Sequence, residues 1–263
     1  MEELQPKIKF HNVTKSFNGA IKNEVILDDL NFEIFAEEFV CILGPSGSGK
    51  STILGLIAGF IKPNTGIVLF NAKPIYRPDS SRTLVFQEYA LFPWLSILDN
   101  VAFGLTTKKY NSKKSREIAL EYLNLVGLAN YKDYSVSQLS GGMKQRVAIA
   151  RALAVEPEIL LLDEPFGALD QYTRESMQLE ILRLWMRSKR TVLFVTHSVD
   201  EALKLADRII VVGGKPGKVL LNTTIAVSRP RDFKSSQLVA IRNQILEKLI
   251  QPDLFMGADI LED

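Results

Sequence analysis

The spacing of hydrophobic positions changes along the chain, and each spacing predicts a different element. Short alternating runs bounded by polar turns predict β-strands near the N-terminus, with Asn18-Gly19 as one turn. A helical pattern then begins at Ser51 and is ended by Lys62-Pro63-Asn64. We therefore expect strands over residues 8–13, 25–35, 39–43, 67–70 and 83–86, and a helix over residues 51–61.

Three helices are predicted next, with no strand signal among them, over residues 96–105, 112–126 and 141–155. Strands and helices then alternate, with strands expected over 159–163, 191–196 and 208–212 and helices over 171–188 and 199–206. Unbroken apolar runs such as Ile159-Leu160-Leu161-Leu162 are typical of strands covered on both faces, as in a parallel sheet. The pattern predicts a doubly wound α/β core with a helical insertion, followed by an amphipathic helix from Ser235 onward.

Composition excludes several classes of protein. Among 263 residues, 46% are hydrophobic and 24% are charged, which is the mixture of a folded globular chain. The 32 Lys and Arg against 30 Asp and Glu leave a net charge of +2, so nothing favours a protein that coats nucleic acid. The single cysteine, Cys41, and a start without a signal-like apolar segment predict a reducing, cytosolic compartment. No apolar run approaches the ~20 residues that a membrane helix needs.

The strongest local motif lies between the strand expected to end at Leu43 and the helix expected from Ser51. It reads Gly44-Pro45-Ser46-Gly47-Ser48-Gly49-Lys50-Ser51-Thr52 and fits the pattern G-x-x-x-x-G-K-[ST] of a phosphate-binding loop. Glycines allow backbone N–H groups to surround phosphate oxygens, and the helix N-terminus adds positive potential. We expect Lys50 to reach the β- and γ-phosphates and the Ser51 hydroxyl to bind Mg²⁺.

Two adjacent carboxylates, Asp163 and Glu164, follow the apolar strand 159–163. Ligands bind at the carboxyl ends of strands in such folds, so Asp163 is expected to hold the metal through water and Glu164 to orient or deprotonate an attacking water. Taken alone, the same residues could be a polar turn leaving the core.

A second anion-binding segment is predicted at the start of the helix 141–155. Ser140 is a natural N-cap, and Gly141 and Gly142 leave backbone N–H groups open to an anion. Taken alone, this is an ordinary helix cap. One nucleotide could use both this helix and the phosphate-binding loop only if the two converge within the chain or across a dimer.

In this order the motifs resemble those of the nucleotide-binding subunits of ATP-binding cassette (ABC) transporters, over roughly residues 7–230. Leu139-Ser140-Gly141-Gly142 matches the signature of that family. By the same resemblance, Gln87 matches the glutamine that reaches metal and attacking water, and His197 the histidine that contacts the γ-phosphate. Gly167-Ala168-Leu169-Asp170 matches the D-loop, and Phe17 matches the aromatic residue that stacks on adenine.

The resemblance implies a P-loop NTPase (RecA-like) α/β core with an antiparallel β subdomain and an inserted α-helical signature subdomain. The ATPase domain would span residues 1–233, with the helical subdomain at about 88–156 and a helical tail over 234–263. It implies ATP and Mg²⁺ as ligands and a head-to-tail dimer with a second ATPase subunit, either another copy or a paralogue. Partners would be transmembrane permease subunits at the cytoplasmic face of the membrane and, indirectly, a solute-binding protein. No nucleic acid is expected.

Aromatic residues gather between Gln87 and Gly104, where they could form core or a groove for the permease. Three short motifs resemble the sequences of importers of nitrate, sulfonate and taurine. They are Leu91-Phe92-Pro93-Trp94-Leu95 in this stretch, Lys215-Pro216-Gly217-Lys218, and Arg229-Pro230-Arg231-Asp232. We therefore expect a subunit that hydrolyses ATP to power uptake of a small solute. The alternatives are the ATPase of an ABC exporter or lipid-trafficking system, and a soluble ABC ATPase without a transport function.

Overall fold

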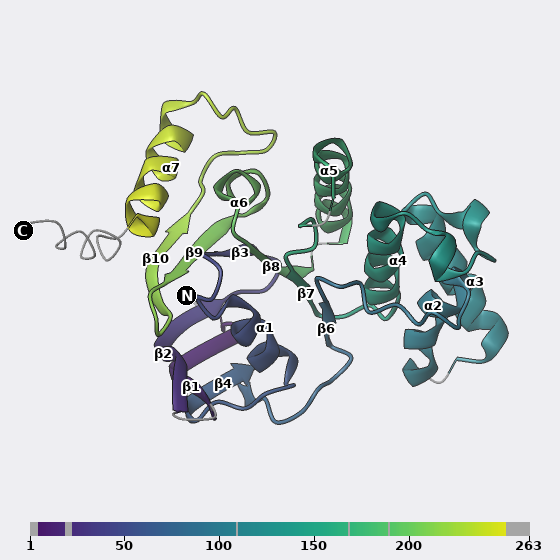
Figure 1. Ribbon diagram of the computed structural model, residues 1–263, viewed down its shortest axis with the longest axis horizontal. Coiled ribbons are helices and arrows are strands. Elements are labelled where there is room, and N and C mark those ends of the chain that lie inside the picture. Colours follow the sequence, from purple (N-terminus) through teal and green to yellow (C-terminus); the bar gives the residue numbers. More distant parts are fainter. Residues whose placement is uncertain (1–4, 19–22, 109, 168, 189, 251–263) are drawn as a thin grey trace, which may run out of the picture.

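The computed structural model describes residues 5–18, 23–108, 110–167, 169–188 and 190–250, which form a larger α/β lobe and a smaller helical lobe (Figure 1). A six-stranded sheet in the order β10-β9-β3-β8-β7-β6 runs through the larger lobe, and all its strands are parallel except β10. Its strands are β3 (Phe39–Leu43), β6 (Arg82–Val85), β7 (Ile159–Asp163), β8 (Thr191–Thr196), β9 (Arg208–Gly213) and β10 (Lys218–Thr224).

A second, antiparallel sheet of four strands in the order β2-β1-β4-β5 covers part of the first. Its strands are β1 (Ile8–Asn18), β2 (Asn23–Ile34), β4 (Thr65–Phe70) and β5 (Lys73–Pro74). Strand β1 pairs with both β2 and β4, so residues far apart in sequence form one surface over helix α1 (Lys50–Ala58). The antiparallel β subdomain predicted from the sequence is present.

Alternate residues of the central strands pack into two cores on opposite faces of the six-stranded sheet. In β3, Val40 and Ile42 face α1 and the antiparallel sheet, whereas Phe39, Cys41 and Leu43 face the other core. That second core contains α5 (Gln171–Ser188), α6 (Val199–Leu205) and α7 (Ser236–Leu249). Burial of each large aliphatic side chain contributes roughly 1.5–3 kcal/mol, so strands buried on both faces must be apolar throughout, as the sequence pattern indicated.

The helical lobe is built from the chain between β6 and β7. It contains α2 (Ile97–Phe103), α3 (Ser112–Leu125) and α4 (Gly141–Ala154), with 3₁₀ turns at Gly104–Lys108, Ala129–Tyr131 and Val136–Gln138. The predicted apolar face of α4 packs into the core of this lobe through Val147, Ala150 and Ala154. The opposite side of α4 enters the core of the α/β lobe through Ala148 and Ala152, so this helix joins the two lobes.

Several sequence predictions need correction. Strand β1 runs to Asn18 rather than ending at residue 13, and the short strand β5 was not predicted. The first helix ends at Ala58 rather than residue 61, because Gly59 adopts φ +81° and its N–H bonds back to Leu56. The helix predicted over 96–105 is shorter, and a 3₁₀ turn continues it to Lys108. Strand β10 was missed because it lies at a sheet edge, where its polar residues face water.

The predicted C-terminal amphipathic helix, α7, packs its apolar face onto the α/β core. Leu238 and Ile245 are fully buried there, and Ile241 and Leu249 pack against the same cluster. Residues 251–263 of the predicted tail lie outside the described part of the chain. None of the described helices combines the length and the hydrophobicity needed to span a bilayer.

Candidate active site

The phosphate-binding motif forms the connection between β3 and α1, at the carboxyl end of the parallel strands. Gly47 and Gly49 have φ of +82° and +88°, a backbone conformation that other residues rarely adopt. A Cβ on Gly49 would lie 2.4 Å from Leu27 Cδ2. Glycine is therefore required at position 49 both for the turn and for the close approach of β2. Of the other loop residues, Pro45, Ser46 and Ser51 are exposed, Thr52 is half-buried, and Ser48 is buried.

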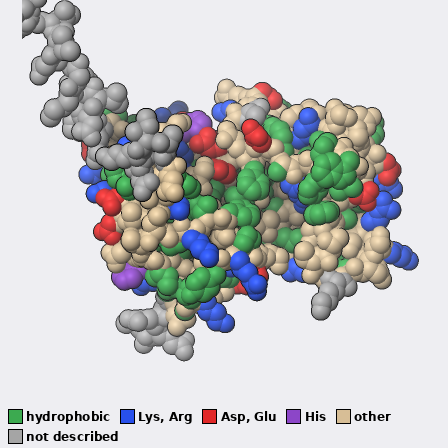
Figure 2. Space-filling view, turned by 60° about the horizontal axis from the view of Figure 1, so that its bottom comes forward, with side chains coloured by type: hydrophobic (Ala, Val, Ile, Leu, Met, Phe, Trp, Pro, Cys, Tyr) green, Lys and Arg blue, Asp and Glu red, His purple; other side chains and the backbone are tan. Residues whose placement is uncertain are grey.

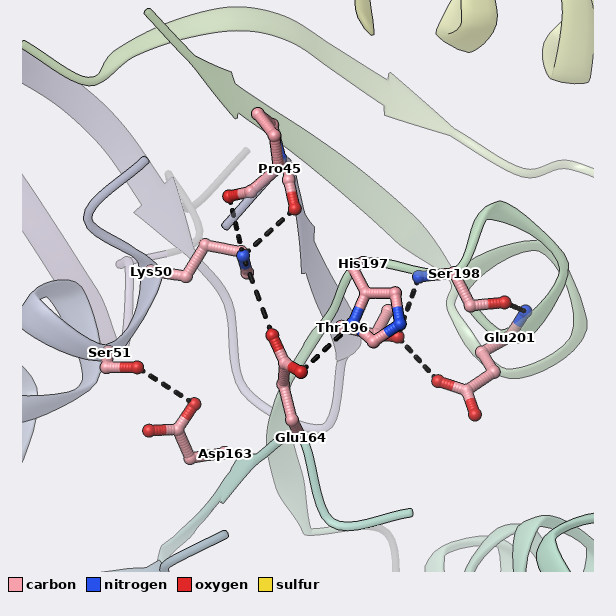
Figure 3. Close-up of polar contacts among 10 residues, drawn as sticks. Pro45, Lys50, Ser51, Asp163, Glu164, Thr196, His197, Ser198 and Glu201 are labelled. Atoms are coloured by element: carbon pink, nitrogen blue, oxygen red, sulfur yellow. Dashed lines mark hydrogen bonds and ion pairs between the residues drawn. The ribbon is translucent and has the colours of Figure 1, made fainter. Parts of the chain in front are cut away.

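Lys50 lies at the mouth of this loop and is only 5% exposed. Its ammonium donates hydrogen bonds to the carbonyl oxygens of Gly44 and Pro45, both at 2.9 Å, and lies 3.6 Å from Glu164 Oε1 (Figure 3). Burial lowers the pKa of Lys50, and the nearby Glu164 carboxylate opposes that shift. A phosphate chain entering the loop would compete with these acceptors for the ammonium.

Ser51 and Asp163 meet on the opposite side of the loop. The Ser51 hydroxyl donates to Asp163 Oδ1 at 3.2 Å, and Asp163 ends strand β7. Burial raises the pKa of Asp163 above its ordinary value, with Ser51 and Lys50 acting in the other direction.

The oxygen donors of Ser51 and Asp163 suit a hard cation such as Mg²⁺. Within the described part of the chain, no three His, Cys, Asp or Glu side chains cluster as a metal site. A metal ion at Ser51 and Asp163 would therefore take its remaining ligands from nucleotide phosphates and water, which is the usual mode for Mg²⁺.

Glu164 follows Asp163 with φ +41°, so its side chain turns toward the loop mouth. Its Oε2 lies 3.0 Å from His197 Nδ1, at the end of the neighbouring strand β8 (Figure 3). A carboxylate oxygen only accepts, so the Nδ1–H donates and Nε2 is free to accept. A non-glycine residue at positive φ stores about 1 kcal/mol of strain, and here it places a carboxylate between Lys50 and His197.

A partly buried network of hydrogen bonds behind His197 was not predicted from the sequence. The Thr196 hydroxyl donates to Glu201 Oε2 at 2.5 Å, and Gln178 Nε2 donates to Glu201 Oε1 at 3.1 Å. The N–H of Ser198 donates to Thr196 Oγ1 at 3.0 Å, and the Ser198 hydroxyl caps α6 by accepting from the N–H of Glu201. The spacing Ser198-x-x-Glu201 is the sequence pattern of a capping box and could have revealed the cap. The network fixes the turn that carries His197.

Gln87 and Phe17, the remaining residues predicted from this side, are both exposed. The Gln87 amide nitrogen lies 3.8 Å from where a Cβ on Gly167 would stand, so it faces the segment after Glu164. Arg151 of α4 donates to the carbonyl oxygens of Tyr89 and Ala90, which ties the stretch after Gln87 to the helical lobe. The Phe17 ring is 43% exposed, and the Lys15 ammonium lies 4.8 Å from its centroid.

The signature residues lie in the helical lobe, apart from the phosphate-binding loop (Figure 1). The Ser140 hydroxyl caps α4 by accepting from the N–H of Met143 at 3.3 Å. A Cβ on Gly141 would lie 3.3 Å from Tyr89 Oη, and one on Gly142 would lie 2.9 Å from Thr173 Cγ2. The loop therefore contributes none of the nearest neighbours of these glycines. The N-termini of α1 and α4, the two predicted anion-binding segments, therefore lie in separate lobes of this chain.

Asp170 of the predicted D-loop caps α5, accepting from the N–H of Thr173 at 2.9 Å. Hydrogen bonds from the Thr173 N–H and side chain lower the pKa of Asp170, whose side chain is exposed. Ala168 lies outside the described residues. The structure thus gathers Lys50, Ser51, Asp163, Glu164 and His197 at one end of the sheet. The signature residues, at the start of α4, and Asp170, at the start of α5, lie outside this group.

Comparison with known proteins gives concordant results. The family model described as "ABC transporter" matches residues 27–167. The bicarbonate transport ATP-binding protein CmpD of Synechococcus elongatus is 42% identical over 254 residues, which cover 93% of this chain and 90% of that protein. The nitrate import ATP-binding protein NrtD of Synechococcus elongatus is 43% identical over 231 residues, 86% of this chain and 83% of that protein.

A solved structure extends the match to the fold. The ATP-binding cassette MJ0796, a dimer in a post-hydrolysis state bound to ADP and Pi, superposes with a TM-score of 0.76 and 36% identity, covering 84% of this chain and 100% of that one. The predicted P-loop NTPase fold is confirmed. This chain therefore belongs to the ABC transporter family, as an ATP-binding subunit whose hydrolysis of ATP is coupled to transport.

Proposed function

We propose that this chain is the ATPase subunit of an importer that takes up a small anionic solute, with nitrate and bicarbonate as the first candidates. Two relatives that match most of its length are named for import of nitrate and transport of bicarbonate. Both solutes are small inorganic oxyanions. The organosulfur solutes expected from the sequence, anionic sulfonates and the zwitterion taurine, belong in the same set of tests. The chain would act at the cytoplasmic face of the membrane as a peripheral subunit.

The proposed mechanism of ATP hydrolysis is supported mainly by the position of Glu164 between Lys50 and His197. In the proposed reaction Glu164 takes a proton from water as the water oxygen attacks the γ-phosphorus, and the bond to the β–γ bridging oxygen of ADP breaks. Lys50 and the N–H groups of the loop hold the phosphates, while His197 and Gln87 orient the water and the γ-phosphate. Mg²⁺, when bound at Ser51 and Asp163, supplies charge neutralisation on the β- and γ-phosphates.

A second ATPase subunit would complete the site. Ser140 caps α4, and Gly141 and Gly142 are the first residues of this helix, away from their own chain's loop. Helix N-termini bind anions, so the proposal pairs this segment with the γ-phosphate held by the other subunit of a head-to-tail dimer. Asp170 would lie at the same contact, and Phe17 would stack on adenine. The dimeric state of the MJ0796 cassette supports this arrangement.

The proposed domains follow the lobes. Residues 1–233 would form the ATPase domain, with the helical subdomain at about 88–156 and residues 234–263 as a C-terminal tail. The chain enters the helical lobe after β6 and leaves it before β7, and α7 begins at Ser236, which supports these boundaries. Residues 1–4 and 251–263 lie outside the described part of the chain.

A groove of about 690 Å³ between the lobes is the proposed docking site for the permease. Its lining includes Phe60 and Phe103, which are 54% and 50% exposed, and the more buried Phe92. Figure 2 shows hydrophobic side chains gathered along the junction of the lobes. The aromatic and apolar residues after Gln87 differ in their surroundings. Tyr89 and Leu91 pack against the core, whereas Trp94 and Phe103 are exposed.

Docking can be tested with one pair of variants. Phe103→Ser should reduce co-purification with the permease without changing ATP turnover of the isolated chain, since Phe103 does not contact the loop. Tyr76→Ser is the control, because Tyr76 is also an exposed aromatic residue, 69% exposed against 50% for Phe103, but lies outside the groove. Equal permease binding by wild type and Phe103→Ser would contradict the assignment.

The solute is tested by reconstituting the chain in liposomes with its permease and solute-binding protein, with ATP on the side of this chain. Uptake of nitrate, bicarbonate, a sulfonate and taurine is measured separately, with and without ATP. ATP-dependent uptake of an oxyanion into the compartment that holds this chain is the expected result. ATP-dependent movement of lipid or solute in the opposite direction would identify an exporter or lipid-trafficking system instead.

A further inference from the structure

The turn between β9 and β10 lies against the phosphate-binding loop. A Cβ on Gly217 would stand 2.2 Å from the carbonyl oxygen of Ser48, and one on Gly44 would stand 2.1 Å from the carbonyl oxygen of Val212. The Gly217 N–H donates to Ile26 at 2.8 Å, and its carbonyl accepts from the Asp28 N–H at 3.1 Å. Only glycine permits contacts this close, so the turn is held in place from two sides.

This turn carries Lys215 to the apex of the loop. The position that a Cβ on Gly47 would take lies 3.6 Å from Lys215 Cε and 3.9 Å from Lys215 Nζ. Lys215 is exposed and makes no ion pair or hydrogen bond with any described residue. Lys218, three residues later at the start of β10, instead pairs with Asp28 at 2.9 Å. Lys218 is thus neutralised by a carboxylate, whereas Lys215 stands uncompensated beside the loop.

We propose that Lys215 is a further nucleotide-binding residue, which contacts the phosphate chain of ATP from outside the loop. ATP bears several negative charges, and backbone N–H groups at Gly47 and its neighbours would hold its phosphate oxygens. A flexible ammonium within about 4 Å of Gly47 can reach an oxygen bound there by changing rotamers. Because the contact would be partly exposed, it adds to the affinity set by Lys50 without replacing it.

This inference rests on the proposed binding of phosphates by the loop, so the experiment tests the two separately. Affinity for ATP is measured by titration calorimetry at low protein concentration, at two salt concentrations, for wild type and a graded series at position 215. We expect Lys215→Ala to weaken ATP binding about three- to tenfold and Lys215→Glu to weaken it further, with Lys215→Arg close to wild type. The loss of affinity on substitution of Lys215 should be smaller for ADP than for ATP and smaller at higher salt. ADP has fewer negative charges, and salt screens the attraction between Lys215 and the phosphates.

Two control variants separate the possible outcomes. Lys218→Ala removes a cation three residues from Lys215, at the start of β10, and should leave ATP affinity unchanged. Lys50→Ala should abolish high-affinity ATP binding, and if it does not, the proposed loop site itself is wrong. If Lys50→Ala abolishes binding but all Lys215 variants bind like wild type, only the inference about Lys215 is overturned. Unchanged ATP affinity together with loss of ATP-dependent dimerisation would likewise overturn it, by placing Lys215 at the subunit contact.

Discussion

Glu164 accepts a hydrogen bond from the imidazole of His197, with Oε2 and Nδ1 3.0 Å apart, although 33 residues separate them in sequence. The two residues directly follow the neighbouring parallel strands β7 and β8, so the sheet itself sets their separation. The bond fixes both the direction of the carboxylate and the tautomer of the ring. Each residue therefore depends on the other for its orientation.

Removal of the imidazole should uncouple ATP binding from hydrolysis. His197→Ala is expected to lower ATP turnover about a hundredfold while ATP affinity stays near wild type, because Lys50 and the loop are untouched. His11→Ala is the matched control, since the only other histidine lies exposed on β1. Phosphate release and ATP titration check the two quantities. Equal losses of affinity and turnover would show that His197 supports binding rather than reaction.

The network behind His197 should contribute to both stability and turnover. Thr196→Val removes the hydroxyl that donates to Glu201 and accepts from Ser198, leaving a carboxylate oxygen and an N–H without partners. We expect a loss of about 1–3 kcal/mol in the free energy of unfolding and a several-fold fall in kcat with KM unchanged. Thr196→Ser keeps the hydroxyl and should restore both quantities. Failure of serine to restore kcat would show that the hydroxyl does not position His197.

Asp163 should lower the stability of the protein at neutral pH. Burial raises its pKa above the ordinary value of 3.8, so the folded state binds this proton more tightly than the unfolded state. The proton bound to Asp163 therefore stabilises the folded state. This stabilisation is present in full below the pKa of the unfolded state and is lost as the pH rises through the pKa of the folded state. In the absence of nucleotide and metal, Asp163→Asn should therefore raise the unfolding free energy by about 0.5–1 kcal/mol at pH 7.5 and abolish turnover.

Thermal unfolding at several pH values measures this gain, which should shrink as the pH falls toward the raised pKa. Asp79→Asn is a control of opposite sign, because hydrogen bonds from Ser81 lower the pKa of Asp79. That substitution should not raise stability at neutral pH. An Asp163→Asn gain that is the same at every pH would mean that its cause is not the buried charge.

Substitution by alanine should have a large effect at one glycine near the loop and a small effect at another. Gly49→Ala places a methyl group 2.4 Å from Leu27 Cδ2 at φ +88°, and we expect it to cost more than about 2 kcal/mol and to abolish ATP binding. Gly55 lies inside α1 at ordinary φ, and its added Cβ would meet only the flexible end of Ile61 at 3.2 Å. Gly55→Ala should change stability by less than about 1 kcal/mol. Chemical denaturation compares the two.

Local sequence was sufficient to predict the parts of the site that lie next to a strand end. The phosphate-binding loop follows the buried run of β3, and Asp163 and Glu164 follow that of β7, so periodicity and motif together placed them. The early end of α1 could also have been read from Gly59, because a glycine there allows a left-handed cap.

Long-range packing accounts for what the sequence did not predict. Strand β10 mixes polar and apolar residues, and only its pairing with β9 makes it a strand. The contact of Glu201 with Gln178 joins two helices, and the approach of Lys215 to Gly47 joins segments 168 positions apart in the numbering. No local pattern records such neighbours, because the folding of the sheet brings them together.

The most direct test of the proposed account compares ATP binding and hydrolysis in the Glu164→Gln variant of this chain. Glutamine keeps the size of the side chain but cannot accept the proton from water, so ATP should bind at wild-type affinity while phosphate release falls at least a hundredfold. Glu175→Gln, at an exposed position on α5, should hydrolyse ATP normally. Normal phosphate release by Glu164→Gln would contradict the assignment of the base and, with it, the mechanism built on Lys50, Glu164 and His197.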